Sequence, residues 1–190
     1  MGWIINPIYI FFYNSMELNF VRIKDSSCTS FSEAMDLYRV SFPIYEQRYF
    51  RNQMQILEKS DYHFCSIYEG ENFVGILLYW ETGTYIYIEH FAIKSQLRGK
   101  NYGSEALKLL IRDSSKTVIL EIDPPKDEIS VRRKYFYERV GFVSNPYIHI
   151  HPPYRKDFSG HSLIVMSYPS LLTTMMYNDF VSYLKSICIP

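Results

Sequence analysis

The chain has 190 residues, which fits one domain with its own core and argues against two. Its 20 basic and 20 acidic side chains balance, so we expect neither nucleic acid nor an anionic membrane as a partner. The cysteines, Cys28, Cys65 and Cys188, lie far apart without a CxxC pair, which argues against a disulfide framework or zinc site and favours a reducing, cytoplasmic location.

The first 15 residues differ from the rest in composition. Residues 3–13 are apolar, but they lack the basic start and the cleavage site of a signal peptide and are too short to span a bilayer. Met16 then opens a stretch typical of a first strand. We therefore predict a non-native or appended extension over 1–15, one domain over 16–168 and a C-terminal helix within 169–190.

The stretch after Met16 predicts one strand and two helices. Residues 18–23 alternate in polarity as a strand does. Ser30 is expected to cap a helix over 31–40, with Glu33 completing a capping box. A second helix is expected over 46–59.

The middle of the chain predicts a three-strand antiparallel meander over 62–68, 73–80 and 85–93, because short polar turns separate these apolar stretches. A basic turn over 98–103 follows, and the next residues, 104–112, have the pattern of a helix.

The last third predicts a strand over 118–122, a helix over 129–140 and a final pair of strands over 142–150 and 163–168. Residues 169–187 carry apolar side chains at helical intervals, and we expect this helix to pack on its own domain in preference to a dimer contact.

This order of elements predicts an α/β (α+β) fold with a mixed, mostly antiparallel sheet flanked by helices. The meander would lead into a parallel pair of strands through the helix after Gly103, because that helix supplies the crossover. Whether the protein is a monomer or a homodimer stays open.

The basic turn between strand and helix has the features of a diphosphate-binding site. Gly99 and Gly103 permit the bend, residues 98–104 supply backbone N–H donors, and the helix that follows supplies its positive end. The spacing fits neither a P-loop nor a dinucleotide-binding fingerprint. An ordinary strand-to-helix loop is the alternative.

Two blocks of sequence, residues 98–103 (RGKNYG) and residues 132–142 (RRKYFYERVGF), resemble the GNAT superfamily of acetyl-CoA-dependent N-acetyltransferases. Residues 98–103 (RGKNYG) are similar to the signature Q/R-x-x-G-x-G/A, with Asn101 in place of the first glycine. Asparagine is the residue most able to replace glycine where the backbone is left-handed. Residues 132–142 (RRKYFYERVGF) resemble the family's R-x-x-x-F-Y-x-x-x-G-F block. The resemblance covers about residues 18–168.

The resemblance implies that acetyl-CoA is the co-substrate. Its pantetheine arm would pair with the strand over 85–93 like an extra strand, and its pyrophosphate would bind to the turn. The expected coenzyme contacts are Phe91, Ala92, Ile93, Arg98, Gly99, Lys100, Asn101, Tyr102, Gly103 and Ser104. Where the family usually carries asparagine, this chain has Ser130.

Glu89 is the expected general base. Strand alternation puts Tyr87, Glu89, Phe91 and Ile93 on one face and His90 on the other. Burial among aromatic rings would raise the pKa of Glu89 towards neutrality, as a base requires. A structural glutamate paired with an arginine is the alternative.

Tyr137 is the expected acid, because the resemblance aligns it with a tyrosine that lies near the coenzyme sulfur. Its phenol would donate a proton to the departing thiolate. The alternative is a core tyrosine on an amphipathic helix.

The acceptor side is expected to include Tyr87, Tyr147, Tyr154 and Glu121, which is also the second candidate for the base. His149 and His151 would share a face of a strand with His161 nearby, as a metal site requires, but no carboxylate or cysteine stands at ligand spacing. We therefore expect loop histidines near residues 152–157 and predict no metal.

These inferences predict an N-acetyltransferase that moves acetyl from acetyl-CoA to a primary amine by direct attack, with a small molecule as acceptor. The alternatives are a peptide or protein N-acetyltransferase and a non-catalytic acyl-CoA-binding or interaction module.

Overall fold

A computed structural model describes residues 16–188; the extension predicted over 1–15 and residues 189–190 lie outside the described residues. The strands are β1 (Leu18–Ile23), β2 (Tyr62–Glu69), β3 (Asn72–Glu81), β4 (Tyr85–Ile93), β5 (Thr117–Ile122), β6 (Val143–Ser144), β7 (His149–His151) and β8 (His161–Tyr168). The helices are α1 (Phe31–Ser41), α2 (Phe50–Leu57), α3 (Tyr102–Arg112), α4 (Glu128–Val140) and α5 (Thr174–Cys188), with short 3₁₀ turns η1 (Ile44–Glu46) and η2 (Ser95–Leu97).

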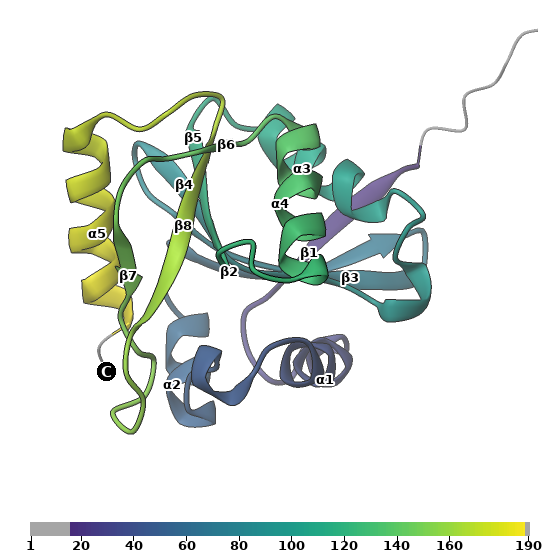
Figure 1. The fold of residues 1–190 in the computed structure, drawn as a ribbon. Coiled ribbons are helices and arrows are strands. Elements are labelled where there is room, and N and C mark those ends of the chain that lie inside the picture. The colour runs from purple at the N-terminus through teal and green to yellow at the C-terminus, as the bar shows by residue number, and fades with distance from the viewer. Residues whose placement is uncertain (1–15, 189–190) are drawn as a thin grey trace, which may run out of the picture.

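The strands form one mixed sheet in the order β1-β2-β3-β4-β5-β8-β6, with β7 paired to β8 (Figure 1). Every pairing is antiparallel except that of β4 with β5. The predicted fold class, with its meander leading into a parallel pair, is confirmed.

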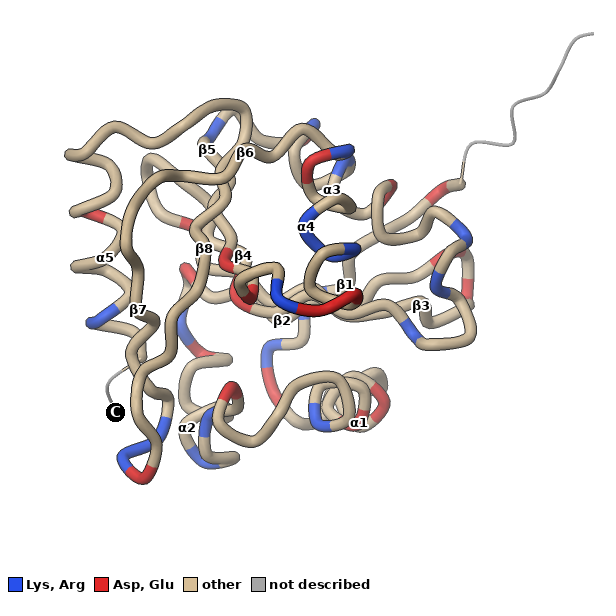
Figure 2. The backbone as a smooth tube through the Cα atoms, in the orientation of Figure 1, with Lys and Arg blue, Asp and Glu red and all other residues tan. Residues whose placement is uncertain are grey.

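Helices cover both faces of the sheet. On one face, α1, α2 and α5 bury apolar side chains against a cluster that contains Phe64 and Trp80. On the other face, α3 and α4 pack against a cluster that contains Ile67 and Leu77. Blue basic and red acidic residues lie close to one another in the helices and turns of the described chain (Figure 2). The sheet therefore has an apolar core on each side, and α5 belongs to the first of them.

A bulge in β4 decides where its side chains point. Leu78 of β3 pairs with His90, but the next residue, Tyr79, pairs with Ile88, so that Glu89 is left without a partner. One extra residue reverses the alternation of a strand. Tyr87 accordingly belongs to the core cluster of α1, α2 and α5, whereas Ile93 belongs to that of α3 and α4. The predicted common face for Tyr87, Phe91 and Ile93 is therefore wrong.

Beyond the bulge, β4 parts from β5. The two strands pair only over Tyr85–Ile88 and Thr117–Leu120. The remainder of β5 continues to pair with β8. Residues 89–93 of β4 thus have β3 on one side and an opening on the other.

The first predicted helix is confirmed as α1, but its predicted cap is not. Ser30 has helical dihedral angles and its side chain makes no capping hydrogen bond. Glu33 forms an ion pair with Lys94 at 3.0 Å. This side chain joins α1 to the end of β4 and is not available for a capping box.

The helix predicted over 46–59 is shorter than expected, since α2 begins only at Phe50. Gln47 has extended backbone angles. The Arg155 side chain donates to the backbone carbonyl oxygens of Gln47 (2.7 Å) and Arg48 (3.2 Å). These long-range bonds take the place of helical ones.

The strand predicted over 142–150 is two short strands, β6 and β7. Pro146 cannot donate to a neighbouring strand. The side chain of Asn145 donates to Ser167 Oγ (2.9 Å) and accepts from the N–H of Leu172 (2.8 Å). This break ties β8 to the segment that leads into α5.

Candidate active site

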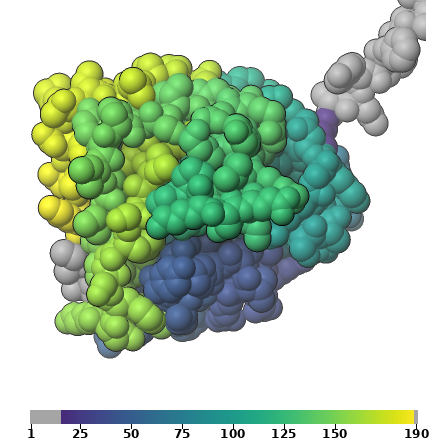
Figure 3. Space-filling view, viewed as in Figure 1, coloured from purple at the N-terminus to yellow at the C-terminus, as the bar shows by residue number. Residues whose placement is uncertain are grey.

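A groove with a volume of about 690 Å³ opens where β4 and β5 part. Its walls come from the segment between α1 and α2, the end of β4, the turn into α3 and one side of α4. In Figure 3 the α4 segment lies directly beside the segment that joins α1 and α2. Nine of the ten expected coenzyme contacts line the groove: Phe91, Ala92, Ile93, Arg98, Gly99, Asn101, Tyr102, Gly103 and Ser104. Lys100 is exposed and is not part of the lining.

The turn at the end of this groove is left-handed at two positions. Gly99 has φ 77° and Asn101 has φ 69°, which matches the expectation that asparagine here replaces a left-handed glycine. Among the described residues, none accepts a hydrogen bond from the backbone N–H groups of 99–104. These donors lie at the N-terminus of α3 and are therefore suited to an anion.

The two sequence blocks meet at Gly103. A Cβ atom at this position would lie 3.1 Å from Cζ of Phe136, so the glycine permits close packing of α3 on α4. Arg98 Nε donates to the carbonyl oxygen of Ile93 at 3.1 Å, which folds the turn back onto β4.

Tyr137 lies on α4 and lines the same groove. Its hydroxyl makes no hydrogen bond with the described residues, and burial raises its pKa to about 12. It is therefore a protonated phenol at neutral pH. Ser130 belongs to the N-terminal cap of α4. Its N–H donates to Asp127 Oδ1 at 2.8 Å, and its hydroxyl completes the capping box of this helix.

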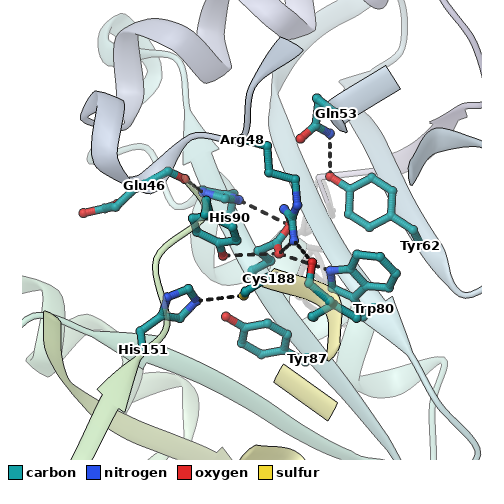
Figure 4. A network of polar contacts seen from close by, with 12 residues as sticks. Glu46, Arg48, Gln53, Tyr62, Trp80, Tyr87, His90, His151 and Cys188 are labelled. Atoms are coloured by element: carbon teal, nitrogen blue, oxygen red, sulfur yellow. Dashed lines mark hydrogen bonds and ion pairs between the residues drawn. The ribbon is translucent and has the colours of Figure 1, made fainter. Parts of the chain in front are cut away.

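The side chain of Glu89 is fully buried, and both of its carboxylate oxygens are hydrogen-bonded. Arg48 holds both carboxylate oxygens, at 2.7 and 2.6 Å, and its guanidinium lies beside Trp80 in Figure 4. Trp80 Nε1 and the Tyr154 hydroxyl each donate to Oε1 at 3.2 Å. Arg48 also donates to the carbonyl oxygen of Ile187 at 3.2 Å. The pair thereby links the β4 bulge to the segment before α2 and to the end of α5.

The pKa expected for Glu89 is wrong. Burial alone would raise it, but the charge and hydrogen bonds of Arg48, with His90 Nδ1 3.6 Å from Oε2, outweigh burial and hold the pKa far below its usual value. These contacts match the alternative of a structural glutamate paired with an arginine. The catalytic role of Glu89 itself stays a prediction.

A second, smaller cavity of about 60 Å³ lies on the other side of the opening and is lined by Tyr87, Glu121 and Tyr154 of the expected acceptor residues. Tyr147 is not among its lining residues. Its hydroxyl donates to the carbonyl oxygen of Leu172 at 3.0 Å, and its ring stacks on that of Tyr177. The structure thus brings three of the four together.

Glu121 is held by a buried polar cluster. Tyr87 donates to it at 2.5 Å, His149 Nε2 donates to its other oxygen, and His151 Nε2 lies 3.7 Å away. Burial opposes its charged form, but His151, His149 and Tyr87 lower its pKa. His149 and His151 belong to β7 and are buried. The loop account of these histidines is therefore wrong, whereas the strand predicted over 142–150 does include His149. Within residues 16–188, no group of three or more His, Cys, Asp or Glu side chains is placed to hold a metal ion.

A model of the acetyltransferase (GNAT) family matches residues 30–142, which is more than half of the chain. The chain belongs to the GNAT acetyltransferase family. The predicted enzyme class, an acyltransferase, is thereby confirmed. No curated protein sequence matches this chain. No helix of the described residues is long and apolar enough to cross a membrane.

Solved structures of GNAT proteins share this fold. A Bacteroides thetaiotaomicron protein assigned to the family has 26% identity and a TM-score of 0.83, over 89% of this chain and 97% of its own. The ribosomal-protein-S18-alanine N-acetyltransferase of Escherichia coli has 13% identity and a TM-score of 0.56, over 83% and 96%. An aminoglycoside 6'-N-acetyltransferase solved with coenzyme A has 14% identity and a TM-score of 0.55, over 80% and 96%.

Sequence reasoning missed two residues of this GNAT site. Arg48 and Glu46 lie in the stretch predicted as a continuous helix, where charged side chains are expected to face solvent. In the structure Arg48 is buried, and Glu46 lines both cavities. One feature of the sequence could have indicated Arg48. Glu89 was expected to be buried, and a buried carboxylate requires a cation as its partner.

Proposed function

We propose that this GNAT enzyme transfers the acetyl group of acetyl-CoA to a primary amine of a small molecule by direct attack. One observation carries the proposal: a groove runs from the opening between β4 and β5 to a turn whose backbone N–H groups have no acceptor among residues 16–188. Family membership and the coenzyme A bound by the aminoglycoside acetyltransferase of the same fold support acetyl-CoA as the co-substrate.

The chain's own groups fit each part of acetyl-CoA. The N–H donors of 99–104 and the N-terminus of α3 bind the pyrophosphate. Residues 89–93 of β4 have no strand partner on the side of the groove within the described part of the chain, and there they pair with the pantetheine arm. An N–H group of Phe91 or Ile93 polarises the thioester carbonyl, and Tyr137 protonates the departing thiolate.

The cysteines support direct attack without an acetyl-enzyme. None of Cys28, Cys65 and Cys188 lines either cavity. Burial raises the pKa of the Cys65 thiol to about 12, and that of Cys188 is also raised by burial. A neutral thiol outside the groove is not a nucleophile for the thioester.

The size of the second cavity limits what can enter it. At about 60 Å³, it admits an aminomethyl group and little more. A small molecule presents such a group without a large surrounding surface, which supports a small acceptor. A peptide N-terminus remains the alternative acceptor, because the fold is shared with the S18-alanine acetyltransferase.

The test is thiol release from acetyl-CoA in the presence of propylamine, putrescine, amino acids, kanamycin and short peptides, with calorimetry of acetyl-CoA binding. We expect saturable binding and turnover with at least one small amine. Turnover with peptides alone would favour the peptide acetyltransferase, and binding without turnover would favour the non-catalytic module. Absence of acetyl-CoA binding would contradict the proposal at its first step.

A further inference from the structure

The boundary between the two cavities consists of charged residues. The described residues that line both cavities are Glu46, Glu89, Glu121, Asp123 and Arg133. An acceptor amine in the smaller cavity has to meet the thioester in the larger groove across this boundary. A proton acceptor at this boundary would therefore lie beside the path of the attacking nitrogen.

Four of these five residues already have partners. Arg48 holds both oxygens of Glu89. Tyr87 and His149 hold the oxygens of Glu121. Asp123 and Arg133 pair with each other at 2.6 Å.

Glu46 differs from the other four. Its carboxylate makes no hydrogen bond or ion pair with the described residues. In Figure 4 it points away from the cluster of Arg48 and Trp80. It is half-buried, so that a ligand in the groove can reach it.

The backbone of Glu46 is fixed although it lies between two helices. Its N–H donates to the carbonyl oxygen of Pro43 at 2.9 Å. His90 Nε2 donates to the Glu46 carbonyl oxygen, also at 2.9 Å. His90 is the neighbour in sequence of both Glu89 and Phe91. The η1 turn is therefore anchored to the part of β4 that is expected to hold the thioester.

We propose that Glu46 is the general base that takes the proton from the acceptor ammonium; this rests on the proposed function. The N–H bond of the ammonium breaks, and its proton binds to the Glu46 carboxylate. The freed nitrogen lone pair attacks the thioester carbon, and the C–S bond breaks as the thiolate takes a proton from Tyr137. The new amide nitrogen loses a second proton, which reprotonates Tyr137, and Glu46 releases its proton to solvent. The products are therefore the amide, the free thiol and one proton.

The charges around Glu46 agree with this role. Burial raises its pKa, and the nearby Asp123 adds to the increase, whereas His90 and Arg133 oppose it. Tyr45 of the same turn also faces this group of charges. A carboxylate with a raised pKa is a better proton acceptor than an exposed one. Glu89, by contrast, acts as a positioning residue that keeps the β4 bulge in place.

The test compares Glu46→Gln with wild type and with Glu58→Gln, an exposed carboxylate at the end of α2. The assay uses acetyl-CoA and the amine of the panel that wild type acetylates fastest. At neutral pH we expect kcat/KM of Glu46→Gln to fall about 10²-fold or more, since general base catalysis contributes this much. Its Kd for acetyl-CoA and its Tm should match those of wild type, as should all parameters of Glu58→Gln.

The pH profile separates a base from a structural residue. The defect of Glu46→Gln should shrink as the pH approaches the pKa of the amine, because the free amine needs no base, and Glu46→Asp should restore part of the rate. An unchanged rate, or a loss equal at every pH, would overturn the role of Glu46. If wild type acetylates no amine, the proposed function fails, and the base with it.

Discussion

Glu89 and Glu46 border the same two cavities and have opposite surroundings. Glu89 lies in the β4 bulge with four hydrogen bonds to its oxygens, and Arg48 keeps it ionised. Glu46 lies on a short turn, and its carboxylate is without a partner among the described residues. Both are glutamates near the expected thioester, so position alone does not assign a role. The partners of each carboxylate decide whether it can accept a proton.

The largest expected effect comes from removing the partner of Glu89. Arg48→Met leaves a buried carboxylate without its cation, and we expect a loss of about 3–5 kcal/mol in the free energy of unfolding. Urea denaturation measures it. Arg132→Met is the matched control, because Arg132 pairs with Glu128 at the surface; its loss should stay below about 1 kcal/mol. Equal losses in both variants would contradict the importance of the buried pair.

Neutralising Glu89 and Glu46 one at a time tests whether only Glu89 contributes to stability. Glu89→Gln removes charge-assisted hydrogen bonds from a buried site, and we expect it to lower the free energy of unfolding by about 2–3 kcal/mol. Glu46→Gln breaks no contact with the described residues, so its stability should stay within about 0.5 kcal/mol of wild type. Denaturation of the two variants side by side checks this. A reversed order would show that Glu46 is the structural residue.

Lowering the pH should change the contributions of Glu89 and Glu46 to stability in opposite directions. The pKa of Glu89 is lowered in the folded protein, so its stabilisation is complete above the unfolded value of about 4.3 and is lost as the pH falls towards the folded pKa. The pKa of Glu46 is raised, so this residue lowers stability above its ordinary pKa. Between about pH 5 and 3, stability of Glu89→Gln should therefore fall less steeply than that of wild type or Glu46→Gln. Parallel curves for all three would contradict the ion pair.

The smallest effect tests a single bond to Glu89. Tyr154→Phe removes the hydroxyl that donates to Oε1 at 3.2 Å. Since Arg48 still holds the carboxylate, we expect the free energy of unfolding to fall by about 1 kcal/mol. A thermal melt beside that of Tyr147→Phe, whose hydroxyl donates to the carbonyl of Leu172, provides the comparison. If Tyr154→Phe lost as much stability as Arg48→Met, Tyr154 and not Arg48 would be the residue that mainly holds the Glu89 carboxylate.

Local chemistry made much of the fold predictable from the sequence. The meander follows from alternation and turn residues, and the end of α4 follows from Gly141, which has φ 105°. The left-handed backbone at Asn101 was likewise expected from its place in the motif. Each of these features depends on a few neighbouring residues.

The parts of the site that were missed depend on contacts between distant residues. Arg48 and Glu89 are 41 positions apart, and no periodicity connects them. No glycine or proline in β4 indicates a bulge. The bulge depends instead on the pairing of β4 with β3 and on the hydrogen bonds that hold Glu89. Without the bulge, parity arguments assign side chains to the wrong face of the sheet.

The bond from Arg48 to the carbonyl oxygen of Ile187 couples two parts of the chain that are far apart in sequence. The last turn of α5 contacts the same guanidinium that holds the β4 bulge. Unwinding this turn would therefore remove one of the contacts that orient Arg48 towards Glu89.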